Sequence, residues 1–140
     1  MAERAKDSYE RAMDAVAAAC ERCGLRKASE RRDTKASYDY TYELEIGDST
    51  IGDTELTGTS ARKDFTVIAT IKTPSGGNAA DDKRKTHEVR VKIERAFLTI
   101  DQPEGFVFIG IPISTSQPSY DNDGCTFEAE ITCSTCEGIV

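Results

Sequence analysis

The sequence predicts a two-layer α+β domain, in which an antiparallel sheet with a long hairpin carries two helices on one face. Three observations favour this class. Two segments carry apolar residues at helical spacings, and two segments of alternating polarity flank a glycine- and aspartate-rich stretch. A second pair of strand-like segments follows the second helix, which gives the order α-β-β-α-β-β. The chain has 140 residues, a usual size for one domain, so we expect a single domain over residues 1–140.

The first helix is expected over residues 2–23. Apolar residues recur there at spacings of three and four, and the run "AVAAAC" has high helix propensity. Gly24 is the expected C-cap, because glycine enters the left-handed conformation without a steric penalty. The basic segment "RKASERRD" that follows is interpreted as a solvated loop.

The long hairpin is predicted from strands over residues 38–46 and 61–73. In "YDYTYELEI" the aromatic and aliphatic side chains fall on one face and the polar side chains on the other. Residues 47–60, rich in glycine, aspartate, serine and threonine, are expected to form a flexible polar loop between the strands. The acidic residues of the polar face are Asp39, Glu43 and Glu45, and those of the loop are Asp48, Asp53 and Glu55.

Residues 79–98 are compatible with two structures. The segment "HEVRVKIE" (87–94) alternates like a strand, but apolar residues also line one helical face and the flanks "AADDKRK" and "ERAFL" favour a helix. We predict a helix, with Asn78 or Asp81 as its cap and an i,i+4 pair between Glu88 and Lys92.

Two further strands are predicted at 105–114 and 125–133. Pro112 is expected near the end of the first strand or at a sheet edge, because proline donates no hydrogen bond to a neighbouring strand. In "CTFEAEITC" the cysteines, Phe127, Ala129 and Ile131 are expected to point one way, and the threonines and glutamates the other. The segment "SQPSYDNDG" between them is interpreted as a turn region.

The charge balance argues against a nucleic-acid-binding surface. The chain carries 18 basic and 25 acidic residues, a formal net charge of −7. Affinity for a phosphate backbone comes mainly from clustered lysine and arginine, so strong binding is not expected. An acidic surface can still lie beside DNA that must slide past without adhering. No segment is apolar enough to predict a signal peptide or a membrane span.

Signatures of catalysis are scarce. His87 is the only histidine, and it lies beside Glu88 in a charged segment that is typical of a helix surface. No nucleophile motif and no phosphate-binding glycine loop accompany it. The sequence therefore does not favour an enzyme.

Two Cys-x-x-Cys pairs leave two interpretations open. Cys20 with Cys23, and Cys133 with Cys136, have the spacing of structural zinc ligands. Both pairs also end predicted elements, and Cys20 and Cys133 continue apolar faces, as buried free thiols do. We favour buried thiols. A zinc site within one subunit requires the end of the first helix to lie against the end of the last strand.

Several stretches carry a likeness to a known family. An amphipathic helix precedes "YDYTYELEIG", and a polar loop precedes "TSARKDFTVIATIKTP". The charged segment "DDKRKTHEVRVKIERAFL" follows, and "GFVFIGIPISTSQPSY" and "GCTFEAEITC" close the chain. This pattern, over residues 2–134, resembles the tail terminator (tail completion) proteins of long-tailed bacteriophages and related gene-transfer particles. The two cysteine pairs are not part of the family pattern.

The resemblance implies a structural virion protein of the tail or neck, assembled in the host cytoplasm, with no catalytic residues and no cofactor. Such proteins form a ring, typically six-fold, that caps the head-proximal end of the tail tube, stops tube polymerisation and joins the tail to the head connector. The implied partners are further copies of the chain, the tail tube protein, the connector protein and DNA that passes through the lumen without specific binding. No membrane is expected. The ring or lumen surface is expected to include Asp39, Glu43, Glu45, Asp48, Asp53, Glu55 and Arg62.

Two alternatives to a tail terminator stay open. One is another ring protein of the phage neck, such as a head-completion protein. The other is a small zinc-stabilised binding module of a cell, which the cysteine pairs would explain.

Overall fold

The computed structural model describes residues 7–28, 40–54, 60–74, 77–100, 106–121 and 124–138, with side chains at most of these positions. It contains two helices and a six-stranded sheet, so the α+β class is confirmed. The helices are α1 (Ser8–Arg22) and α2 (Ala79–Leu98). The strands are β1 (Arg26–Lys27), β2 (Thr41–Thr54), β3 (Ser60–Pro74), β4 (Phe106–Thr115), β5 (Ser119–Asp121) and β6 (Gly124–Gly138).

The sheet is mixed, which corrects the expectation of an antiparallel one. Its strand order is β1-β2-β3-β6-β4, and β5 pairs with β6. All pairs are antiparallel except β1 with β2. Arg26 and Lys27, expected in a solvated loop, form β1, and the Arg26 amide donates to the Tyr40 carbonyl over 2.9 Å. Two residues are too few for a hydrophobic alternation, so no sequence pattern marks this strand.

Helix α1 has well-defined ends. The Asp7 side chain accepts a hydrogen bond from the Glu10 amide, and this N-cap starts the helix at Ser8 rather than near residue 2. Residues 2–6 lie outside the described part of the chain. Cys23 is the C-cap, and Gly24 follows with φ +85°, the left-handed conformation expected for it.

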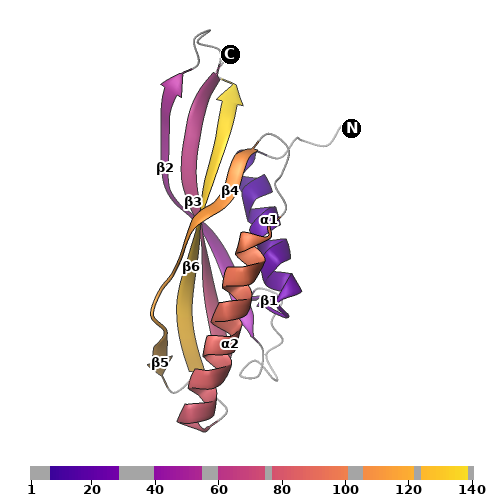
Figure 1. Cartoon of the computed structure of the whole chain (residues 1–140), viewed down its shortest axis with the longest axis vertical. Helices are drawn as coiled ribbons and strands as arrows, with labels where there is room; N and C mark the ends of the chain where they lie inside the picture. Colours follow the sequence, from indigo (N-terminus) through magenta and orange to yellow (C-terminus); the bar gives the residue numbers. More distant parts are fainter. Residues whose placement is uncertain are drawn as a thin grey trace.

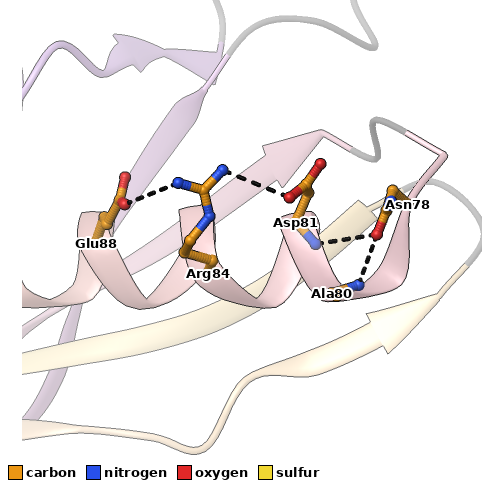
Figure 2. A network of polar contacts seen from close by, with 5 residues as sticks. All are labelled: Asn78, Ala80, Asp81, Arg84 and Glu88. Atoms are coloured by element: carbon orange, nitrogen blue, oxygen red, sulfur yellow. Dashed lines mark hydrogen bonds and ion pairs between the residues drawn. The ribbon is translucent and has the colours of Figure 1, made fainter.

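Helix α2 has the bounds expected from sequence, and the helical alternative for residues 87–94 is confirmed. Asn78 is its N-cap, and its side chain accepts from the Ala80 and Asp81 amides over 3.0 and 3.2 Å. Figure 2 shows how Arg84 continues this network, since it contacts both Asp81 and Glu88 one turn away on either side. Glu88 therefore forms its ion pair with Arg84, and not with Lys92 as expected.

The long hairpin exists, but its first strand is longer than predicted. β2 continues from the expected end at Ile46 to Thr54, so most of the polar segment 47–60 is strand and not loop. Its register against β3 shifts between Ile46 and Ser49, where Gly47 and Asp48 form a bulge. This part of β2 packs against little of the hydrophobic core, so most of its side chains are polar. Its main-chain hydrogen bonds to β3 do not depend on apolar side chains, so the strand continues.

The closing strands also differ in detail from the prediction. β6 runs to Gly138, so "CSTCEG" belongs to the strand, and β5 forms inside the predicted turn region. β4 is the edge strand at the end of the sheet opposite β1, and one of its register shifts lies between Gly110 and Ile113. Pro112 lies within this irregularity, at an edge, as proline requires.

Both helices and one face of the sheet contribute to a single core. α1 and α2 lie next to each other along the sheet (Figure 1). The side chains in this cluster that are fully buried include Val16, Ile93, Phe97, Val67, Ala69, Ile71, Ala129 and Ile131. The inward positions on β3 and β6 alternate as the sequence predicts, and each fully buried aliphatic side chain contributes about 1.5–3 kcal/mol of transfer free energy.

The sheet extends past the helices at one end. β2, β3 and β6 continue beyond both helices at the top of Figure 1. We call this end of the sheet the distal arm and define it as residues 49–54, 60–65 and 133–138. Its base lies against the first turn of α1, and its far end extends past both helices. Ser49, Phe65 and Cys133 pair across the three strands at its base.

Candidate functional site

The sheet face opposite the helices carries a cluster of glutamates. Strand alternation puts Glu43 and Glu45 of β2 on this open face, and both are exposed. Glu128 and Glu130 of β6 are also exposed on it. Because the helices pack on the other face, these four carboxylates project from the side of the sheet that neither helix covers.

The register arranges the four glutamates in two rows. Glu43 lies opposite Thr70 of β3, and Thr70 lies opposite Glu128. In the same way Ile68 lies between Glu45 and Glu130. Neighbouring strands are about 4.8 Å apart, so the backbones within each row are roughly 10 Å apart.

These distances make the open face strongly negative. Carboxylates within about 10 Å of each other interact at physiological ionic strength, because the Debye length is of that order. Thr70 and Ile68, which lie between them, carry no compensating charge. The nearest cation along β3 is Lys72, two residues from Thr70. The face therefore repels polyanions and attracts cationic groups.

On the open face of the distal arm, a polar contact joins β3 to β6. Arg62 Nε lies 3.0 Å from Asp64 Oδ1, and the Ser134 hydroxyl donates to the same carboxylate oxygen. These contacts hold the pKa of Asp64 below its usual range, with the Ser134 hydrogen bond the largest cause. Ser134 is only 1% exposed, so its hydroxyl needs this partner.

On the other face of the arm, a buried lysine joins β3 to the start of α1. Lys63 is 8% exposed, and its Nζ donates to the Ser8 hydroxyl over 3.0 Å. The same Nζ lies 3.5 Å from the centroid of the Tyr9 ring, close enough for a cation–π interaction. The Tyr9 ring meets Phe65 edge-on at 4.9 Å. The sequence analysis missed this cluster, although Lys63 continues the apolar alternation of Phe65 and Val67 towards the N-terminus.

The expected site residues fall into three groups. Glu43 and Glu45 lie on the open face, where β6 adds two glutamates that had not been assigned to a site. Asp48 is exposed at the β2 bulge, and Arg62 is exposed in the arm. Asp53 belongs to β2, but its side chain, and all of Asp39 and Glu55, lie outside the described residues.

The two cysteine pairs lie at different places along the sheet. Glu21, next to Cys20, accepts a hydrogen bond from the Tyr42 hydroxyl, so the end of α1 lies beside Tyr42. Tyr42 is in one row with Phe127 of β6, through the β3 strand between them. Cys133 is six residues farther along β6, which corresponds to about 20 Å. The first pair therefore does not meet the second within one subunit.

The described cysteines are free and mostly buried, as expected for thiols in a core. Burial raises the pKa of both Cys20 and Cys133 to about 12, so both are neutral thiols rather than thiolates at physiological pH. Cys23 is half-buried, and its thiol donates to the Lys92 carbonyl. The Cys136 side chain lies outside the described residues. Within the residues that the structure describes, no three metal-ligating side chains come together.

Three further observations concern expectations from the sequence and similarity to known proteins. His87 is exposed on α2, as expected for a helix-surface residue. Neither described helix is long and apolar enough to cross a membrane. Comparison with protein-family models and with curated proteins returns no match for this chain.

Proposed function

We propose that this chain is the two-layer subunit of a structural ring that caps the head-proximal end of a phage tail tube and joins it to the head connector. The observation that carries the proposal is the pair of glutamate rows on the open sheet face. A ring whose subunits turn this face inward has an acidic lumen. The duplex carries one negative charge per about 1.7 Å, so such a wall repels DNA and lets it pass without adhesion.

The rest of the molecule suits this role. The helices cover the face of the sheet opposite the glutamates. If the glutamate face lines the lumen, the helices form the outside of the ring. The distal arm extends beyond the helices (Figure 1), so its surface is available to a neighbour. A closed ring needs two different surfaces on each subunit that complement each other, and an elongated subunit with distinct ends provides them.

Solution mass tests the assembly. We expect either a ring or a monomer that forms a ring when the tail tube protein of the same particle is added, with shortened or length-controlled tubes in electron micrographs. A chain that stays monomeric and leaves tube length unchanged would contradict the proposal. A ring that binds a head connector but no tube would indicate another neck protein.

Charge reversal tests the lumen. The Glu128→Lys/Glu130→Lys variant should form rings that retain linear duplex DNA, whereas the wild-type ring should not retain it. The matched control is Glu88→Lys/Glu94→Lys, which makes the same charge change on α2 and should leave DNA unbound. Equal DNA retention by both variants would mean that only the net charge matters and that the open face does not line the lumen.

A further inference from the structure

A groove runs between α1 and the edge of β2. Its apolar lining consists of Met13, Ala17, Tyr42 and Leu44, and its volume is about 440 Å³. A second hollow of about 370 Å³ lies on the other side of the same edge and shares Leu44 and Lys27 with the first. Leu44 therefore separates two depressions that together follow the edge of the strand.

The rim of this groove is acidic. Glu10, Asp14 and Glu21 line it from α1, at spacings that put them on one side of the helix. Glu43 and Glu45 line the second hollow, and Lys27 is the only cation lining either depression among the described residues. Glu21 also accepts a hydrogen bond from the Tyr42 hydroxyl. The two depressions together are lined by five carboxylates and one described lysine, and this net negative charge favours a positively charged occupant.

The edge itself has main-chain groups in position to bind a strand. β1 pairs with β2 only at Thr41 and Tyr42, and no described strand pairs with that side of β2 beyond them. The Tyr40 carbonyl points towards β1, because it accepts from Arg26. Main-chain groups alternate sides along a strand, so those of Leu44 and Ile46 point the same way.

From these observations we infer that the groove binds an extended basic segment of a partner protein, with alternating apolar and Lys/Arg side chains, added as a strand along the edge of β2. Main-chain hydrogen bonds to Leu44 and Ile46 provide the affinity common to strand addition. Apolar side chains of the segment contact Met13, Ala17 and Leu44, and its cations face the carboxylates of the rim. The inference goes beyond the ring function, and its readout does not require ring assembly.

Peptide binding provides the first test. The probe is a labelled peptide of alternating valine and lysine, titrated with the full chain and followed by fluorescence anisotropy. We expect saturable binding that weakens as salt is raised from 0.1 M to 1 M, because the Debye length falls from about 10 to about 3 Å. Absence of binding at low salt would overturn the inference.

A matched pair of variants separates the groove from general attraction to an acidic protein. Asp14→Asn/Glu21→Gln removes two charges from the rim and should weaken binding about fivefold, in line with surface ion pairs. Glu128→Gln/Glu130→Gln removes two charges from β6, on the open face, and should leave binding within about twofold. Equal losses in both variants would show non-specific attraction and overturn the inference.

Hydrogen exchange tests the mode of binding. Peptide should slow exchange of the Leu44 and Ile46 amides, while amides of the central strand β3 should not change. Unchanged exchange at both edge amides would overturn strand addition.

The variant Ala17→Arg fills the groove, so it should abolish peptide binding. The contrary outcome has two parts: the wild-type chain is an oligomer that binds no peptide, and the Ala17→Arg variant is a monomer. In that case the groove holds a second copy of the chain and the inference is wrong.

Discussion

The part of the sheet that the helices cover and the distal arm differ in what fills their inward-facing positions. Under the helices these positions on β3 and β6 are almost fully buried, and they are apolar except for Thr73, which hydrogen-bonds to Thr86 of α2. In the arm, beyond the apolar Phe65 and Cys133 at its base, they include Lys63 and Thr135, which are buried and polar, and Ile51, which is 63% exposed. The covered part therefore depends on hydrophobic burial, whereas the arm depends on polar and cation–π contacts that contribute less per residue. We expect the arm to open locally at a lower free energy than the covered part.

The largest effect should come from the covered part. Phe97→Ala removes a side chain that is 0% exposed between α2 and the sheet, and it should lower the free energy of unfolding by about 3–5 kcal/mol. The neighbouring Leu98→Ala provides a control, since Leu98 is 62% exposed and its loss should cost less than about 0.5 kcal/mol. Urea denaturation of both variants measures the difference. Similar losses would mean that α2 does not pack as described.

Alkaline pH should also destabilise the domain, through one thiol in the covered part and one at the base of the arm. Burial raises the pKa of Cys20 and Cys133 from 9.0 to about 12, so each thiol ionises more readily in the unfolded chain. The stability that this provides is complete below pH 9 and is lost as pH rises through the interval up to 12. Each thiol should cost about 1.4 kcal/mol at pH 10.

The control for the alkaline effect is Cys20→Ala/Cys133→Ala. This variant is less stable at neutral pH because of its cavities, but its stability should fall less steeply between pH 9 and 11. Urea denaturation across this interval measures both slopes. Parallel curves for wild type and variant would show that other groups cause the alkaline loss.

A smaller and local effect is expected at the base of the arm. Lys63→Met removes the contacts with Ser8 and the Tyr9 ring, and it should cost about 1–2 kcal/mol. Hydrogen exchange should accelerate at the arm amides and remain unchanged around Ile71. Lys72→Met, on the open face of the same strand, is the control and should accelerate neither. Uniform acceleration would contradict a separate arm.

The smallest effect concerns the outer contact of the arm. The pKa of Asp64 is depressed, so its contribution to stability is present above the usual carboxyl pKa and is lost as pH falls through the depressed value. Both Asp64 and Arg62 are about half exposed, and we expect only a few tenths of a kcal/mol. Hydrogen exchange measures the free energy of local opening of the arm as a function of pH. In Asp64→Asn this free energy should fall less steeply at acidic pH than in the wild type. An equally steep fall in both would exclude this carboxylate as its cause.

The same contrast explains which elements the sequence predicts. β3 and α2 follow from their alternation and flanks because their side chains pack against a core, and burial imposes a period on the sequence. The polar continuation of β2 past Ile46 has no such period, so glycine and aspartate suggest a loop there. β1 is two residues long and depends on a main-chain contact with Tyr40 that no side-chain pattern encodes.

The candidate site was predictable in part for a related reason. The outward orientation of Glu43, Glu45, Glu128 and Glu130 follows from alternation within each strand. That they form one cluster depends on the strand order, in which β6 inserts between β3 and β4. Long-range order of this kind is not contained in the period of any single segment. The groove beside β2 depends in addition on where α1 lies against the edge.

The bulge after Ile46 has a consequence for solubility. A long, flat edge strand is a template on which identical chains add one after another into a fibril. At Gly47 and Asp48 the strand leaves its regular register, and a Cβ at Gly47 would meet the Thr66 hydroxyl and lie 3.1 Å from the Ile68 Cδ1. A strand added beside Leu44 therefore loses its hydrogen-bond partners within a few residues. The edge accepts a short segment, and stacking of whole chains stops there.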